Sequence, residues 1–292
     1  MHKARIATIG FFDGVHRGHR FLFAQLKELA HERDLEPLIF TFDRHPREVL
    51  TGVSPAMLTT SMERQQLLAL HAEVRVLPFA DVQCFTAEQF MRYLCEQENV
   101  EVLLMGYDHR FGSDQLKGFS EYEKVARRVG IRVERAHECL VDGLPVSSTR
   151  IRKLLHEGQM RQVNRLLGYN YSLSGIVEHG NGIGNQIGFP TANICIQSDK
   201  LLPMSGVYSA QTTVDNNSFV AVVNIGNNPT VGNDAVSVES HIIDYQGDLY
   251  GEELVVTFDD FIRSEQKFGS LNELKEQITR DILQLQMCSI EG

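Results

Sequence analysis

The first half of the chain alternates between short apolar runs and longer amphipathic stretches. In residues 21–30 the apolar positions recur at the spacing of a helix with one buried face. Strands that alternate with helices of this length predict a parallel, doubly wound α/β sheet. The apolar runs assigned to buried strands of this sheet are residues 6–9, 37–42, 74–79, 100–105 and 131–134.

The segments between these runs carry start and stop signals. Residues 43–55 contain two prolines and a glycine and are expected to form a loop. A helix is expected to begin at Ser61, and Thr86 is expected to cap the start of another. Because ligands bind beyond the carboxyl ends of the strands in such sheets, the loops after these runs are candidate sites.

The pattern changes after residue 167. Residues 151–167 are helical in pattern with a break at Gly158, and Gly168 ends the helix. We therefore place the domain boundary there and expect domains at residues 1–167 and 168–292.

Beyond the boundary, short apolar runs are separated by Gly, Asn and Pro. Evenly spaced short strands with turn residues between them predict a small antiparallel β-barrel. A final amphipathic helix over residues 271–287 is expected to pack on it. The clearest strand candidates are residues 174–177, 206–214, 219–225, 237–244 and 253–261.

Composition narrows the class of protein. The net charge of −10 disfavours a general nucleic-acid-binding surface, although a local basic cluster suffices to bind ATP. The five cysteines are scattered without C-x-x-C spacing, so neither a disulfide framework nor a zinc site is expected, and a reducing cytoplasm fits. No uncharged apolar run reaches about 18 residues, and the first residues do not read as a signal peptide, so no membrane association is expected.

The string G-F-F-D-G-V-H-R-G-H at residues 10–19 lies between the first strand and the first helix. Its glycines allow a sharp turn and a close approach of a ligand. His19 falls near the helix start, where free N–H groups favour an anion, and His16 lies three residues earlier. This arrangement suits nucleotide phosphates, with imidazoles donating to charge that develops in a transition state.

Two other segments of the first half suit phosphate or ligand binding. Residues 146–152, V-S-S-T-R-I-R, place hydroxyls and arginines at a helix start. Residues 106–112, G-Y-D-H-R-F-G, follow a buried strand and bracket polar and aromatic side chains with glycines.

In the second half, a Gly-rich flap at residues 179–184 precedes G-F-P-T-A-N at residues 188–193. Residues two apart on an extended segment face the same way, so Thr191 and Asn193 can reach one Mg²⁺ or phosphate. A base near that metal should be a carboxylate. The alternating strand at residues 238–244 puts Glu239 on one face with His241.

The first string resembles the nucleotidyltransferase motif of bacterial bifunctional riboflavin kinase/FMN adenylyltransferases (prokaryotic FAD synthetases), and G-F-P-T-A-N resembles their kinase motif. The resemblance extends from residue 5 to about residue 285. It implies a Rossmann-like FMN adenylyltransferase domain followed by a riboflavin kinase β-barrel. It also implies that ATP, with Mg²⁺, phosphorylates riboflavin to FMN and then adenylylates FMN to FAD, releasing ADP and pyrophosphate.

For the adenylyltransferase, the resemblance implies His16 and His19 as catalytic residues. It implies contacts to FMN from Asp108, Arg110 and Phe111, although His109 stands where the family usually has Phe. The implied ATP-binding residues are Gly10, Phe11, Asp13, Gly14, His16, Gly18, His19, Ser148, Thr149 and Arg150.

For the kinase, the resemblance implies Glu239 as the base that accepts the proton of the riboflavin 5′-hydroxyl. Asn224, Asn228 and Asp248 lie in segments that also match, whereas Asn185 replaces a basic residue that is common in the family. Thr191 and Asn193 are the implied metal ligands, and Arg263 and Phe268 the implied flavin contacts. The implied ATP-binding residues are Gly180, Gly182, Gly184, Gly188, Pro190, Thr191 and Asn193.

Three alternatives stay open at this point. The chain could adenylylate another acceptor, such as pantetheine phosphate or nicotinamide mononucleotide. It could be an aminoacyl-tRNA synthetase fragment, although it is acidic and has no K-M-S-K-S-like segment. It could also be a flavin-binding sensor or carrier, or a kinase-only protein, with a degraded adenylyltransferase half. We expect a monomer or weak homo-oligomer that binds only small molecules.

Overall fold

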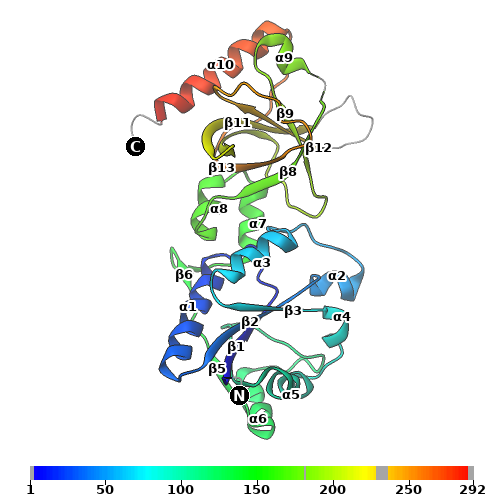
Figure 1. The fold of residues 1–292 in the computed structure, drawn as a ribbon, viewed down its shortest axis with the longest axis vertical. Coiled ribbons are helices and arrows are strands. Elements are labelled where there is room, and N and C mark those ends of the chain that lie inside the picture. Colours follow the sequence, from blue (N-terminus) through cyan, green and yellow to red (C-terminus); the bar gives the residue numbers. More distant parts are fainter. Residues whose placement is uncertain (1–2, 181, 228–235, 289–292) are drawn as a thin grey trace. The chain divides into compact units, whose positions relative to one another are not determined.

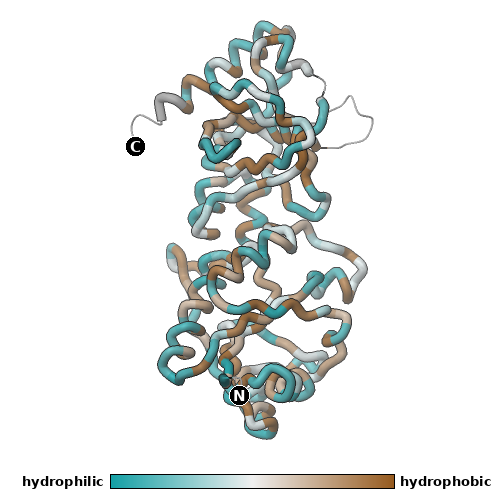
Figure 2. Tube along the Cα trace, in the orientation of Figure 1, coloured by the Kyte–Doolittle hydropathy of each residue, from teal (hydrophilic) through white to brown (hydrophobic). Residues whose placement is uncertain are grey.

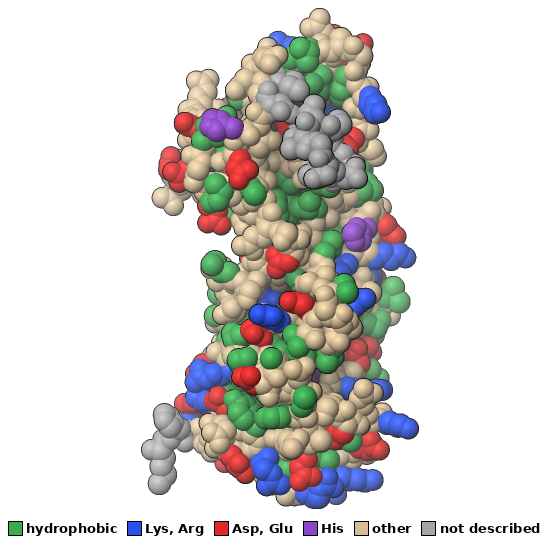
Figure 3. Space-filling model, turned by 90° about the vertical axis from the view of Figure 1, so that its right-hand side faces the viewer, with side chains coloured by type: hydrophobic (Ala, Val, Ile, Leu, Met, Phe, Trp, Pro, Cys, Tyr) green, Lys and Arg blue, Asp and Glu red, His purple; other side chains and the backbone are tan. Residues whose placement is uncertain are grey.

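The computed structural model describes residues 3–180, 182–227 and 236–288 (Figure 1). The chain divides into two compact units, Met1–Ser148 and Thr149–Gly292. Figure 2 shows hydrophobic stretches along the strands of each unit, as expected where each builds its own core. On the face in Figure 3, Lys and Arg side chains are interspersed with Asp and Glu.

The first unit is built on a five-stranded parallel sheet in the order β3-β2-β1-β4-β5. This confirms the predicted doubly wound α/β fold, and every predicted apolar run contributes a strand. The strands are β1 (Arg5–Ile9), β2 (Glu36–Phe42), β3 (Glu73–Leu77), β4 (Val100–Met105) and β5 (Arg132–Arg135).

Helices cover both faces of this sheet. Side chains alternate between the faces along each strand, so neighbouring residues pack in two different cores. On β2, Phe40 packs in a core with side chains of α5 and α6, whereas Ile39 packs in a core with side chains of α1 and α3. The predicted helix starts are confirmed: Thr60 caps α3, and Thr86 forms a capping box with Gln89. These helices are α1 (Arg17–Glu32), α3 (Ser61–Ala69), α5 (Ala87–Glu98) and α6 (Phe119–Val129).

The prediction of a loop over residues 43–55 is wrong in part, because the segment contains helix α2 (Pro46–Thr51). Pro46 occupies the first turn, where its missing N–H is not needed, so it starts a helix instead of breaking one. The side chain of His45 caps this helix. Another short helix, α4 (Phe79–Val82), follows β3, and a tight hairpin of β6 (Leu140–Val141) and β7 (Leu144–Pro145) precedes α7.

The second unit is a closed antiparallel barrel of six strands in the order β10-β11-β12-β9-β8-β13, which confirms the predicted barrel. Strand β9 was not among the predicted runs, because it carries the end of the G-F-P-T-A-N motif. The strands are β8 (Ser172–Glu178), β9 (Ala192–Ile196), β10 (Gly206–Val214), β11 (Asn217–Asn227), β12 (Val236–Ile242) and β13 (Glu253–Arg263).

Helices α7 (Ser148–His156) and α8 (Met160–Leu167) are separated at Gly158, as the sequence predicts. Helix α8 is tied to the barrel by Asn164, whose amide donates to the Phe258 carbonyl (2.8 Å) and accepts from the Tyr171 N–H (2.8 Å). The predicted final helix is α10 (Leu271–Cys288), and a short helix that was not predicted, α9 (Ile183–Ile187), lies in the Gly-rich flap.

Candidate active sites

The G-F-F-D-G-V-H-R-G-H segment holds an unusual backbone between β1 and α1. Phe12, Gly14 and Val15 all have left-handed φ values, of 59°, 79° and 37°. For Phe12 and for the β-branched Val15 this conformation is strained, at a cost of about 1–3 kcal/mol each. Such strain persists only where the surroundings fix the backbone.

Asp13, which is buried, supplies much of that restraint. Its carboxylate accepts from the backbone N–H groups of Leu58 (3.0 Å) and Thr59 (3.1 Å) and from the Thr59 hydroxyl (3.1 Å). The same hydroxyl accepts from the N–H of Gly14, and Ser148 Oγ donates to the Asp13 carbonyl (2.9 Å). Asp13 and Ser148, both predicted ATP-binding residues, are thus positioned to hold the loop.

The structure stacks His16 on His19, with ring centroids 3.6 Å apart and 17° between the planes. His16 is the N-cap of α1, and its Nδ1 accepts from the His19 backbone N–H (3.3 Å). The proton of a neutral His16 therefore lies on Nε2. Gly18 packs tightly here, because a Cβ would lie 3.1 Å from the His16 ring and 3.2 Å from the Val146 carbonyl, so a side chain would push these neighbours aside.

His19 is held neutral at physiological pH. Burial lowers its pKa well below the ordinary value, and the neighbouring imidazoles of His16 and His109 lower it further. A neutral imidazole retains one N–H donor, and an anion beside the ring raises its pKa, which favours protonation of the second nitrogen. The stacked pair is therefore suited to bind phosphate, although His19 carries no positive charge before the anion arrives.

A cavity of about 560 Å³ lies beside this loop in the first unit; we call it the Phe111 cavity. Two of the predicted FMN residues, Arg110 and Phe111, line it, whereas Asp108 is exposed beside His109. Phe11, a predicted ATP-binding residue, also lines it. The Arg64 guanidinium lies 3.9 Å above the Phe11 ring.

Several lining residues of the Phe111 cavity were not predicted. They come from the end of β2, from the N-cap of α2, from α4 and the turn after it, and from α5. Most are aromatic side chains that belong to no motif. Only the fold brings them together. They include Phe42, His45, Phe79, Phe85 and Phe90. Of the other predicted residues, Thr149 and Arg150 follow Ser148 in the first turn of α7 and fall in the second unit.

In the barrel, a row of directly paired residues crosses all six strands. Residues paired directly across antiparallel strands project from the same face of the sheet. Glu239 pairs with Asn224 on one side and with Asn193 on the other, so these side chains share a face. The complete row is Glu178, Asn193, Glu239, Asn224, Val207 and Arg263.

Glu239 also accepts a hydrogen bond from the hydroxyl of Thr191, with Oγ1 3.5 Å from Oε2. Burial raises the pKa of Glu239 above its ordinary value, and the hydrogen bonds from Thr191 and Ser237 partly oppose this rise. A carboxylate with a raised pKa accepts a proton more readily, provided that it is ionised at the working pH. The geometry and the pKa shift are both those of a candidate general base.

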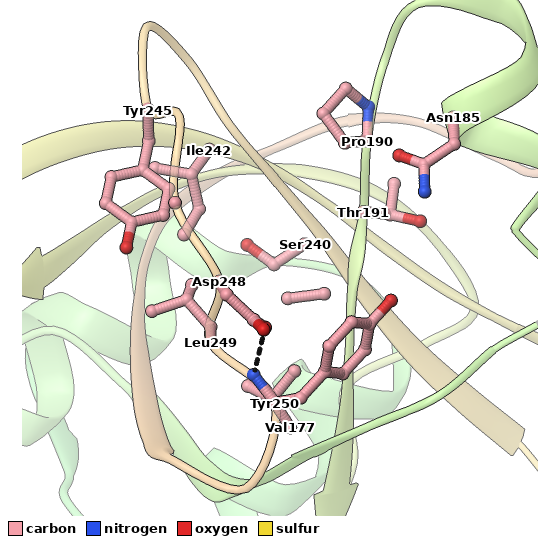
Figure 4. Close-up of a pocket in the computed structure, with 12 residues that line it drawn as sticks. Val177, Asn185, Pro190, Thr191, Ser240, Ile242, Tyr245, Asp248, Leu249 and Tyr250 are labelled. Carbon is pink, nitrogen blue, oxygen red and sulfur yellow. Dashed lines mark hydrogen bonds between the residues drawn. The ribbon is translucent and has the colours of Figure 1, made fainter.

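Two cavities lie on opposite faces of the β9-β12 pair. The first, of about 320 Å³, is lined by Ser240 and Ala192, which pair directly; we call it the Tyr250 cavity. Tyr245 and Tyr250, from the loop after β12, also line it; Figure 4 shows Tyr245 on one side and Thr191 on the other, with the Tyr250 ring below Thr191. The backbone N–H of Tyr250 donates to Asp248 (3.0 Å), which fixes this loop. Asn185 and Pro190 complete the rim beside Thr191.

The second cavity, of about 270 Å³, is lined by Glu239 and Arg263; we call it the Arg263 cavity. Asp281 of α10 binds the Arg263 guanidinium through both carboxylate oxygens, at 2.8–3.1 Å. Phe268 also lines this cavity, and the Arg263 Cζ lies 5.9 Å from its ring centroid. Both predicted flavin residues therefore lie at one cavity with the predicted base.

Thr191 is the residue that both cavities share. Its hydroxyl can therefore reach a ligand in either cavity. Neither Asp281 nor the two tyrosines were predicted as site residues, because an isolated Asp on a helix and aromatic residues in a loop give no specific signal.

The glycines of the flap pack closely on Thr191 and Asn193, the predicted metal ligands. A Cβ at Gly180 would lie 2.0 Å from the Asn193 amide, and one at Gly184 would lie 3.3 Å from the Thr191 hydroxyl. Gly182 and Gly188 bound α9 with left-handed φ values of 65° and 86°. Residues 181 and 228–230, which the resemblance also covers, lie outside the described residues.

The donors around Thr191 fit a hard cation. A hydroxyl, an amide oxygen and a carboxylate are the oxygen ligands that Mg²⁺ uses together with nucleotide phosphates. Among residues 3–180, 182–227 and 236–288, no group of three or more His, Cys, Asp or Glu is arranged to hold a metal ion. In the same described residues, no helix combines the length and apolar character that crossing a membrane requires.

Comparisons with known proteins cover both units. A riboflavin kinase (Flavokinase) family model matches residues 167–288, and an FAD synthetase family model matches residues 1–150. A solved structure described as a macrolide-efflux protein from Streptococcus pneumoniae superposes with a TM-score of 0.87 at 28% identity, covering 96% of this chain and 93% of that one.

Two relatives are each named bifunctional riboflavin kinase/FMN adenylyltransferase. The one from Pseudomonas fluorescens is 37% identical over 288 residues, covering 96% of this chain and 92% of the relative. The one from Escherichia coli K12 is 36% identical over 284 residues, covering 95% and 90%. With both halves matched by family models and by full-length relatives, the chain belongs to the family of bifunctional riboflavin kinase/FMN adenylyltransferases.

Proposed function

We propose that the barrel transfers the γ-phosphoryl group of ATP to riboflavin, with ATP in the Tyr250 cavity and riboflavin in the Arg263 cavity. The observation that carries this assignment is Thr191, which lines both cavities and donates to Glu239. A phosphoryl group passing from one ligand to the other must cross the edge of β9 at this residue. Tyr250 offers a ring for the adenine, and the Arg263 cavity offers apolar walls for the flavin.

Glu239 acts as the general base for the 5′-hydroxyl of riboflavin. It takes the hydroxyl proton while the oxygen forms a bond to the γ-phosphorus and the bond to ADP breaks. Its raised pKa makes it the stronger proton acceptor. The direct pairing with Asn193 and Asn224 fixes its position, and positioning contributes much of the rate in phosphoryl transfer.

Mg²⁺ is the expected metal of this site, held by Thr191 and Asn193 together with the phosphates of ATP. When bound, it neutralises phosphate charge and orients the γ-phosphoryl group. Gly180 and Gly184 let the backbone of the flap pack directly against these two side chains.

The first unit joins FMN to the AMP part of ATP. A phosphate oxygen of FMN forms a bond to the α-phosphorus as the bond to pyrophosphate breaks. This nucleophile is already an anion, so a strong base is not needed. His16 donates through Nε2–H and His19 through its remaining N–H to the phosphate charge.

The flavin of FMN lies in the Phe111 cavity, whose volume and aromatic lining suit a planar ring system. Arg110 at this cavity supplies a positive charge for the FMN phosphate, and Asp108 lies at its margin. The proposal also places the enzyme in the cytoplasm, where ATP is supplied, as a monomer or weak homo-oligomer.

The functional boundary at residues 167/168 is part of this proposal, and it can be tested with two fragments. Residues 149–292 retain α7 and α8 with the barrel, whereas residues 168–292 lose the Asn164 anchor of β13. If the boundary is correct, both fragments phosphorylate riboflavin, and the longer one has the higher melting temperature. Loss of the kinase reaction in the shorter fragment alone moves the boundary to the start of α7.

Replacement of His16 by Ala tests the assignment of the two reactions to the two units. If Nε2–H of His16 stabilises the transition state, FAD formation from FMN falls roughly 10²–10³-fold. FMN formation from riboflavin in the same preparation is unchanged. His31→Ala, an exposed histidine at the other end of α1, serves as the matched control. Undiminished FAD formation by His16→Ala contradicts the assignment.

A further inference from the structure

His109 occupies a fixed position at the carboxyl end of β4. Its backbone N–H donates to the Gly106 carbonyl (3.2 Å), which closes a turn directly after the strand. Its imidazole lines the Phe111 cavity, with its centroid 6.2 Å from that of Phe111. The side chain is therefore held by the end of a buried strand, which is a rigid place for a ligand contact.

One ring nitrogen of His109 is orphaned. Nδ1 is buried and has no hydrogen-bond partner in the described part of the chain. Burial lowers the pKa of His109 to about 4, so the ring is neutral at physiological pH and carries a single N–H. A buried N–H without an acceptor is rarer than an unpaired acceptor, so the proton belongs on Nε2. The donor that His109 can offer to the cavity is thus Nε2–H.

His109 lies among apolar walls of the cavity. The cavity walls near it are largely aromatic, with Phe11, Phe90 and Phe111 among them. Aromatic walls hold a planar ring by stacking but do not fix its rotation in the plane. A polar donor held among them does, because a buried acceptor left unpaired is costly. His109 shares the polar part of the lining with His45, Gln83, Arg110, Ser113 and Gln115.

Resting on the proposed adenylyltransferase function, we propose that His109 Nε2–H donates a hydrogen bond to an acceptor on the isoalloxazine ring of FMN. The carbonyl oxygens and unprotonated nitrogens of that ring are such acceptors. His109 is therefore a positioning and specificity-determining residue of FAD synthesis. It acts on the flavin end of the substrate.

A different role would be electrostatic, through His19. His109 does lower the pKa of His19, but it is the smallest of three causes, after burial and His16. Removing His109 therefore leaves His19 neutral. The two roles predict different kinetics, because a flavin contact changes KM for FMN, whereas an effect on His19 changes the pH dependence of kcat.

The test compares His109→Phe with His109→Gln in the full-length protein, using purified FMN and ATP. Phe keeps a flat ring but removes the donor, and Gln keeps an N–H donor. His109→Phe is expected to raise KM for FMN roughly 5- to 150-fold, the factor for one unpaired buried acceptor. His109→Gln is expected to recover most of this loss, and kcat and its pH profile are expected to stay within about twofold.

Thermal unfolding of the full-length variants, followed by circular dichroism, reports whether the first unit, which contains His109, is folded. An unchanged KM for FMN in His109→Phe, or a shifted pH profile of kcat at constant KM, overturns the inference. A wild-type protein that forms no FAD contradicts the proposed function itself, so the two failures are distinguishable.

Discussion

Replacing Glu239 by Gln removes a proton acceptor from the kinase site and little else. The amide has nearly the shape of the carboxylate and can still accept from Thr191, 3.5 Å away. Asn193 and Asn224, its partners across the strands, are retained. The substitution therefore isolates the proposed base from the positioning of the site.

The expected loss follows from the role of a positioned base, which contributes roughly 10²–10⁴-fold to a rate. Stability should not fall. Burial raises the pKa of Glu239 in the folded state, so its ionised form costs stability once the pH exceeds the unfolded value. Gln removes that cost, and the melting temperature at neutral pH should be unchanged or slightly higher.

The assay is steady-state formation of FMN from riboflavin and Mg²⁺–ATP across the acid range. In the wild type, kcat/KM should fall as Glu239 becomes protonated, with one apparent pKa above the ordinary value for Glu. The acid limb should vanish in Glu239→Gln. FAD formation from added FMN is the internal control, and Glu253→Gln, an exposed carboxylate on β13, is the matched variant.

Retention of more than about a tenth of the wild-type kcat by Glu239→Gln would refute the assignment, because a general base contributes at least 10²-fold. An acid limb that persists in the variant would point to another titrating group.

Three further predictions follow from the contacts. Asp281→Ala leaves the Arg263 guanidinium without its buried partner, so the free energy of unfolding should fall by about 3–5 kcal/mol and KM for riboflavin should rise. A denaturation midpoint and a KM equal to those of the wild type would refute this. Gly180→Ala places a Cβ 2.0 Å from the Asn193 amide, so kinase activity should fall while FAD formation persists; an unaltered kinase rate argues against the close packing. Asp13→Ala removes three hydrogen bonds, so FAD formation should fall at least tenfold and the first unit should lose about 2–3 kcal/mol in denaturant unfolding; wild-type behaviour contradicts its role as the anchor of the loop.

The elements of the fold were predictable where local signals are strong. The five apolar runs of the first unit each gave a strand, and the capping residues marked the start of α3 and α5. Helix α2 was not predictable from periodicity, because six residues are too few to show a helical pattern, and Pro46 resembles a loop signal until its position in the first turn is known.

The sites were predictable only where residues lie close in sequence. The strings containing His16 and Thr191 can be read directly, since one short loop carries several polar groups. The row through Asn224, Glu239 and Arg263 depends on strand register, which a sequence does not state. The aromatic walls of the Phe111 cavity depend on several elements meeting, and phenylalanines more often signal a core than a site.

The prediction of Asp13 as an ATP contact illustrates a different difficulty. A motif identifies the residues that a site needs. It does not say whether each one touches the ligand or holds the loop that touches it. The carboxylate of Asp13 is engaged by Leu58 and Thr59, so it shapes the backbone on which His16 is presented.

Flavin chromatography after incubation of the full-length protein with riboflavin, ATP and Mg²⁺ tests the central claim most directly. The account predicts that FMN appears first and is then converted to FAD, with pyrophosphate released in proportion to FAD. FMN that accumulates without FAD would contradict the role of the first unit. Riboflavin that binds and stays unchanged would contradict both reactions and leave a flavin-binding protein.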